Sequence, residues 1–153
     1  MQIPKKVVDF LESRTFVIVS TLDKSGSIHN SCKGIVGIDK KGVIYLLDLY
    51  QAHTYRNLKS HPYISITAVD EHRFEGYCLK GKVELLKEDL IEPEIIRLWD
   101  KNIIRRITQR IIKNLKEEKS HVGHPEATFP QPRYLIKMEV ERIVDLAGKK
   151  QRR

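Results

Sequence analysis

The stretch VIYLLDLYQAHTYRNLKSHPYISITAV (residues 43–69) decides the fold that we expect for this chain. It reads as an apolar strand over residues 43–49, a short polar helix over about 52–60 and a strand rich in β-branched residues over 63–69. Pro62 ends the helix, because the residue before a proline avoids helical backbone. One small helix among closely spaced strands favours an antiparallel barrel over a βαβ sheet.

The flanking sequence supplies the other elements of this barrel. A short helix is expected over residues 4–12, and turns at Asp23–Gly26 and Asp39–Gly42 separate the early strands. Four further strands are predicted, over residues 16–21, 28–38, 74–86 and 134–140, the last extended after a kink by residues 142–146. The chain is therefore expected to be mainly β, with six antiparallel strands closed into a barrel that leaves no exposed sheet edge.

A helical insertion is expected over residues 88–120, before the last strand. Apolar residues recur every three or four positions between Ile91 and Leu115, which predicts one or two amphipathic helices, interrupted near Pro93 and around residues 100–102. The opposite face is basic and carries Lys101, Arg105, Arg106, Arg110, Lys113 and Lys116. No aromatic residues interleave with these cations, so the face is more typical of a solvated surface than of a nucleic-acid site.

Composition narrows the class of protein. The chain has 153 residues, a length that suits one domain over residues 1–147, and a disordered basic tail is expected over residues 148–153. Its formal charge of +8 favours anionic partners. No apolar run approaches the roughly 20 residues of a membrane span, and the start does not resemble a secretory signal. The two cysteines are too few for a disulfide framework. These features predict a cytoplasmic protein without a membrane segment.

The order of the motifs resembles that of the pyridoxamine 5'-phosphate oxidase-like FMN-binding split barrels. The segments that carry the resemblance are residues 15–26, 43–47, 53–65, 76–84 and 142–146, which together span nearly the whole chain except the helical insertion. The resemblance implies a six-stranded split β-barrel, usually a homodimer with FMN at the subunit interface. It also implies a flavin-dependent oxidoreductase that uses a small-molecule electron donor or acceptor, with the flavin carrying the chemistry.

The resemblance places seven residues at the cofactor. They are His53, Thr54, Ser31, Cys32, Lys33, Leu47 and Asp48. His53 and Thr54 fall at the phosphate, where backbone N–H groups of a helix start, a hydroxyl and a cation are favourable. Ser31, Cys32 and Lys33 fall on the strand that passes the phosphate and the ring, and Leu47 and Asp48 beside the ring or ribityl chain. The family usually has Arg or Lys where His53 stands, so Lys33 or Arg56 would have to supply a permanent charge.

Other interpretations of these residues stay open. On local sequence alone, His53 and Thr54 are more typical of exposed helix residues, and Cys32 and Cys78 of small packing residues. His121 and His124 are a weak metal signal, but they are candidate ligands if the barrel is a non-catalytic haem-binding module. The end of the chain has no arginine–histidine substrate motif, which argues against vitamin B6 oxidation.

Overall fold

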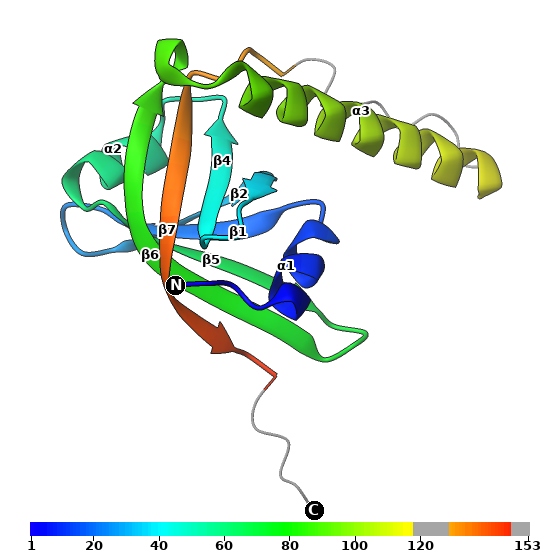
Figure 1. Cartoon of the computed structure of the whole chain (residues 1–153), viewed down its shortest axis with the longest axis horizontal. Coiled ribbons are helices and arrows are strands. Elements are labelled where there is room, and N and C mark those ends of the chain that lie inside the picture. The colour runs from blue at the N-terminus through cyan, green and yellow to red at the C-terminus, as the bar shows by residue number, and fades with distance from the viewer. Residues whose placement is uncertain (118–128, 148–153) are drawn as a thin grey trace, which may run out of the picture.

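The structure, a computed structural model, describes residues 1–117 and 129–147. Its strands are β1 Val17–Leu22, β2 Ile28–Lys33, β3 Ile35–Ile38, β4 Val43–Asp48, β5 Tyr63–Asp70, β6 Glu75–Lys87 and β7 Tyr134–Asp145. Its helices are α1 Lys5–Glu12, α2 His53–Ser60 and α3 Pro93–Lys116, with a 3₁₀ turn at Glu88–Leu90. The strands form one antiparallel sheet in the order β2-β1-β5-β6-β7-β4-β3, which curls into a half-barrel (Figure 1).

The sheet has seven strands and not the expected six, because the predicted strand over residues 28–38 is divided at Gly34. Before this glycine β2 pairs with β1, and after it β3 pairs with β4. The chain thus passes in one residue from one end of the sheet to the other, and the sheet must curl to bring its ends together. In the described residues β2 and β3 each pair on one side only, so the expected closed barrel is an open half-barrel. The mainly-β antiparallel class and the helix before the last strand are confirmed.

The interior of the half-barrel is the main hydrophobic core. Alternate residues of β1, such as Val17 and Val19, point into it, and α1 adds Val7, Phe10 and Leu11 from one apolar side. Burial of such side chains removes apolar area from water, which is the dominant favourable term in folding. The predicted helix over residues 4–12 is confirmed as α1.

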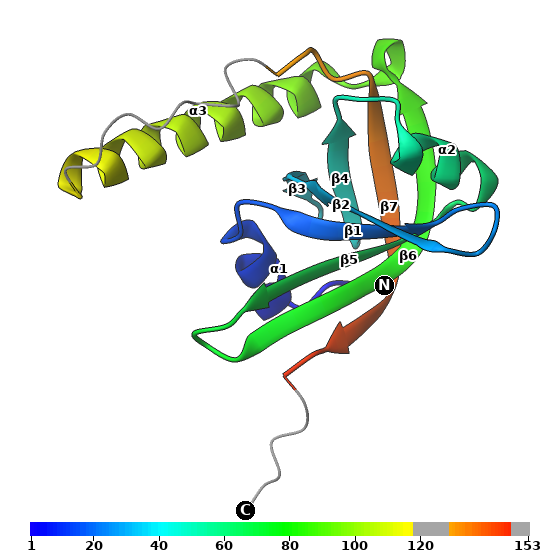
Figure 2. The same cartoon turned by 180° about the vertical axis from the view of Figure 1, so that it is seen from behind.

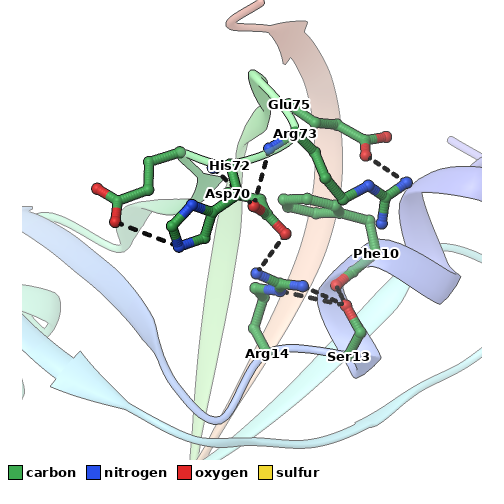
Figure 3. Close-up of polar contacts among 8 residues, drawn as sticks. Phe10, Ser13, Arg14, Asp70, His72, Arg73 and Glu75 are labelled. Carbon is green, nitrogen blue, oxygen red and sulfur yellow. Dashed lines mark hydrogen bonds and ion pairs between the residues drawn. The ribbon is translucent and has the colours of Figure 1, made fainter.

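An ion pair links the segment after α1 to the end of β5, next to the turn between β5 and β6. Arg14 Nη1 lies 3.0 Å from Asp70 Oδ2, while Asp70 Oδ1 accepts hydrogen bonds from the backbone N–H groups of His72 and Arg73 (Figure 3). Arg14 also donates to Ser13 Oγ, whose hydroxyl in turn donates to the carbonyl of Phe10. This network links the first helix to the middle of the chain.

Strands β6 and β7 form the longest pairing of the sheet, with a register shift between Lys80 and Gly81. A Cβ atom at Gly81 would lie 1.9 Å from the carbonyl oxygen of Glu139, so only glycine allows the two backbones to approach this closely. The shift bends the pair, which lets both strands take part in the curl. The two predicted segments 134–140 and 142–146 are one continuous strand, β7.

Helix α3 is a single helix of 24 residues, without the interruptions that the sequence suggested. Pro93 occupies the first turn, where its missing N–H is not needed, and Asp100–Asn102 lie in the helix interior. Its first half packs Ile95, Leu98 and Trp99 on a second apolar cluster, while its second half extends past the sheet (Figures 1 and 2). None of the helices in residues 1–117 and 129–147 is long and apolar enough to cross a membrane.

Candidate functional site

Helix α2 begins at His53, as expected, and polar side chains gather at its start. Its N-cap, Ala52, offers no side-chain cap to the backbone N–H groups of the first turn. Thr54 is buried, and its hydroxyl lies 3.2 Å from the hydroxyl of Ser31 on β2. His53 is exposed, and Arg56 Nη2 donates to its Nδ1 over 3.1 Å. An uncapped helix start beside hydroxyl groups and a guanidinium suits a phosphate.

The inward face of β2 connects this helix start to the far end of the strand. His29, Ser31 and Lys33 alternate along β2 and therefore point to one side. Their β1 partners are Thr21, Val19 and Val17, whose side chains face the core. The His29 ring lies 5.3 Å from that of His53, so the row begins beside α2. Lys33 lies four residues further along the strand than His29, which corresponds to a rise of about 13 Å.

A second polar group surrounds Asp48, at the end of β4. Lys33 Nζ lies 2.7 Å from Asp48 Oδ2, and this pair is nearly enclosed, with side chains 10% and 5% exposed. The hydroxyl of Tyr134, the β7 residue opposite in the sheet, also donates to Asp48 Oδ2. Burial, then the Asp48 carboxylate, raises the pKa of Tyr134 well above its usual range, so its phenol stays a donor at any ordinary pH. Asp48 Oδ1 accepts a hydrogen bond from the Tyr50 N–H.

A pocket of about 350 Å³ lies between these strand ends and α3. Its polar residues in the described chain include Lys33, Asp48, Asn102, Arg106 and Arg110. The rest of its wall is largely apolar or aromatic: Phe16, Ile35, Val36, Leu47, Leu49, Tyr50, Trp99, Ile103 and Phe129. An apolar cleft with a few convergent polar groups is the usual form of a small-molecule site.

The structure divides the seven expected residues between these two places. Ser31, His53 and Thr54 lie together at the start of α2, whereas Cys32, Lys33, Leu47 and Asp48 line the pocket. Cys32 is exposed on the end strand β2, so it is not an enclosed packing residue, which was the alternative interpretation of this cysteine. Cys78 is buried, as expected.

Several residues that complete the site were not among the expected ones. His29 is signalled by its alternation with Ser31 and Lys33, but Tyr134 has no sequence signal because its place opposite Asp48 is a matter of sheet register. Trp99, Arg106 and Arg110 come from the helical insertion. His121 and His124 lie outside the described residues, and no cluster of metal-binding side chains occurs within residues 1–117 and 129–147.

The comparison with protein families identifies the chain. The model of the family described as pyridoxamine 5'-phosphate oxidase matches residues 3–146. The chain belongs to this family. No curated protein sequence matches it. The expected split-barrel relationship is therefore confirmed, since the matched segment contains both the sheet and α3.

Solved structures of the same fold have diverse names. HupZ of Group A Streptococcus is 19% identical with a TM-score of 0.68, over 95% of this chain and 96% of that one. An F420 reductase is 14% identical with a TM-score of 0.61, over 93% and 98%. HutZ of Vibrio cholerae, a haem storage protein, is 17% identical with a TM-score of 0.55, over 94% of each chain. At these identities the likeness shows the fold alone.

Proposed function

We propose that this protein binds FMN and acts as a flavin-dependent oxidoreductase. The observation that carries the proposal is the row His29, Ser31 and Lys33, which joins an uncapped helix start to an apolar pocket. FMN has the same division, with a phosphate at one end and a flat ring at the other. When bound, the flavin supplies the hydride or electron transfer, and the protein sets its orientation and access.

The phosphate end of this site is built from α2 and β2. The first-turn N–H groups of α2 and the hydroxyl groups of Ser31 and Thr54 are the neutral donors. Lys33 is compensated by Asp48, so Arg56 is the better source of the permanent positive charge. Because Arg56 donates to His53 Nδ1, the imidazole presents its other nitrogen as a further donor. Arg56 thus makes up for the arginine or lysine that His53 replaces.

The ring end of the site uses the Asp48 group. Asp48 on β4 accepts hydrogen bonds from Lys33 on β2 and from Tyr134 on β7. These contacts fix the position of the pocket wall beside Leu47. A rigid wall orients a flat ring without moving when the ring binds. In this proposal the flavin carries the chemistry, and no residue of the protein needs to act as a general acid or base.

A homodimer is part of the proposal. The outer face of β1, β2 and β5 exposes Ile18, Leu22, Ile28 and Tyr63, and Ile28 is 71% exposed. Register places these side chains on one side of three neighbouring strands. Exposed apolar side chains gathered in this way are typical of a surface that a partner covers. A monomeric protein at micromolar concentration in sedimentation would contradict this part of the proposal.

Titration of the purified protein with FMN tests the cofactor. Binding should shift the flavin absorption bands and quench the flavin fluorescence. Arg56→Gln should weaken FMN binding by roughly tenfold or more, because it removes a charge-assisted donor. The matched control is Arg73→Gln on the β5–β6 turn, which should leave the affinity unchanged. Absence of FMN binding at micromolar concentrations would reject the proposal.

Haem is the comparison ligand, because one structural relative is a haem storage protein. A haem titration of the same preparation should give a weaker and less specific response than FMN. A strong Soret band that is lost in His121→Ala or His124→Ala would favour the non-catalytic haem-binding module instead.

A further inference from the structure

The second half of α3 carries an apolar stripe that faces away from the sheet. Its members, Ile104, Ile111 and Leu115, are 64%, 43% and 72% exposed. With about 3.6 residues per turn, these three side chains fall within about 40° of one another around the helix axis. Trp99, which packs on the second apolar cluster, points nearly the opposite way. A row of exposed aliphatic side chains is typical of a surface that a partner covers.

Exposed cations flank this stripe. They are Lys101, Arg105 and Lys116, and none of them forms an ion pair within the described part of the chain. Helical spacing places them between about 60° and 120° from the middle of the stripe. Residues 101–116 contain no aspartate or glutamate, so no acidic residue of this stretch offsets the three cations. Asp100, one turn before the stripe, marks its N-terminal limit. The arginines that line the pocket are not part of this group.

The place of α3 in the molecule leaves this stripe accessible. The helix runs along one edge of the molecule, and its second half extends past the sheet (Figures 1 and 2). Residues 101–116 span about 24 Å, so a flat surface can approach them over several turns without meeting the sheet. The segment that follows, residues 118–128, contains no leucine, isoleucine or methionine, and histidine is its only ring-bearing residue besides one proline. This segment is therefore a poor source of apolar side chains to cover the stripe.

Candidate partners differ in how they would use the stripe and the cations. A second copy of the chain would cover the stripe, but pairing two such helices brings the cations of both copies together without acidic partners. Nucleic acid would neutralise the cations and leave the stripe in water. A protein partner is less favoured, since the stripe has no aromatic anchor of the kind that interface hot spots use. A bilayer with anionic headgroups uses both features, because apolar side chains enter the acyl boundary while lysine and arginine reach the headgroups.

We propose that the second half of α3 binds the surface of an anionic lipid bilayer. The stripe enters the boundary between headgroups and acyl chains, and the three flanking cations contact the lipid phosphates. The helix lies on the bilayer and does not cross it, because a basic side chain occurs in every turn of residues 101–116. With few apolar side chains inserted, the binding is reversible. The inference does not rest on the proposed FMN function.

Flotation of the whole chain with lipid vesicles tests the proposal. The two probes are vesicles of phosphatidylcholine alone and vesicles in which about one third of the lipid is phosphatidylglycerol. Each lysine or arginine near an anionic surface contributes about 1 kcal/mol, or about fivefold in affinity, so the protein should bind the anionic vesicles roughly tenfold more tightly or better. This preference should shrink as the salt concentration rises, because salt screens exposed charges.

Variants separate the stripe from its flanking charge. Arg105→Gln should weaken binding to the anionic vesicles by roughly fivefold, and Leu115→Ser should weaken it by roughly tenfold, because it removes an inserted apolar side chain. The control for charge is Lys40→Gln, an exposed lysine in the turn before β4. The control for apolar exposure is Phe74→Ser on the β5–β6 turn, where the phenylalanine is 88% exposed. Both controls should stay within about twofold of the parent.

Each of three results would overturn the inference. Vesicle binding that is absent, or equal for the two lipid compositions, would exclude an anionic bilayer as the partner. A loss in Arg105→Gln without one in Leu115→Ser would mean that charge alone attracts the helix and that nothing is inserted. A change of sedimentation coefficient in Leu115→Ser, without vesicle binding by the parent, would assign the stripe to a second copy of the chain. FMN titrations of both variants should match the parent, since neither residue lies at the flavin site.

Discussion

The β6–β7 pair and helix α3 differ sharply in how they are held. Strand β7 buries Tyr134, Leu135, Ile136, Met138 and Val140 in the two cores. Helix α3 has 24 residues, none of which is buried to this degree, and its Leu115 is 72% exposed. The strand pair therefore contributes buried side chains to the stability of the fold, whereas α3 contributes side chains to a pocket and buries none of its own residues to that degree. Substitutions in the two regions should behave accordingly.

The largest contrast is expected between two apolar truncations. Ile136→Ala in β7 should lower the free energy of unfolding by about 4 kcal/mol, because a fully buried side chain leaves a cavity. Leu115→Ala on α3 should change it by less than about 0.5 kcal/mol, since its side chain is already in water. Urea unfolding of both variants measures the difference. Equal losses would mean that the second half of α3 is covered in solution.

The next contrast concerns ion pairs. Asp48→Asn should cost about 3 kcal/mol, because it leaves the Lys33 ammonium enclosed without its carboxylate. Lys33→Met added to Asp48→Asn should recover part of this loss by removing the buried charge. Glu94→Gln breaks the exposed Arg97–Glu94 pair of α3 and should cost less than about 0.5 kcal/mol. A small loss in Asp48→Asn would show that water reaches Lys33.

Two glycines give a smaller contrast. Gly81→Ala places a methyl group against the Glu139 carbonyl, so one backbone must move, at a cost of about 2 kcal/mol. Gly34→Ala meets only the head group of Arg106, which can rotate away, and should cost less than about 1 kcal/mol. Urea unfolding of both variants measures the contrast. The expected pattern is a clear stability defect in Gly81→Ala and a small one in Gly34→Ala, and equal losses would show that the Arg106 head group cannot move away.

The smallest effect is expected at Asp70, the last residue of β5. Burial alone would raise the pKa of Asp70, but hydrogen bonds from the Arg73 and His72 N–H groups, together with the Arg14 guanidinium, lower it overall. A lowered pKa in the folded state means that the ionised carboxylate stabilises the protein above the unfolded-state pKa of about 3.9. This contribution is lost as the pH falls through the folded-state value.

Asp70→Asn tests this sign. The variant should be less stable than the parent at neutral pH, and the difference should shrink as the pH falls below about 4, where the parent's carboxylate becomes protonated. Thermal unfolding at a series of pH values measures it. A difference that stays constant down to the lowest pH would show that Asp70 contributes no charge-dependent stability.

Much of the fold could be predicted from local signals. Periodicity and turn residues located α1, α2 and most strands within a few residues, and the order of motifs pointed to the family that the match over residues 3–146 confirms. The errors arose where tertiary contacts override local pattern. Residues 28–38 look like one strand, but Gly34 lets the chain change partner at the point where the curled sheet meets itself. Pro93 looks like a break, but it starts α3.

The candidate site shows the same limit. His53 and Thr54 could be placed at a helix start because Pro62 and the strand before it set the position of α2. Arg106 and Arg110 were read only as part of a basic helix face, since nothing in the local sequence says which cations turn toward the sheet. Their place depends on the direction in which α3 leaves the 3₁₀ turn after β6.

The sequence by itself determined the mainly-β class, the helical insertion and the polar start of α2, because each depends on side-chain type and spacing along a short stretch. Only the tertiary structure decided that Lys33, Asp48 and Tyr134 form one enclosed group and that Arg106 lies over Gly34. Sheet register and helix direction are set by the packing of residues far apart in the chain. No local pattern of residues records that packing.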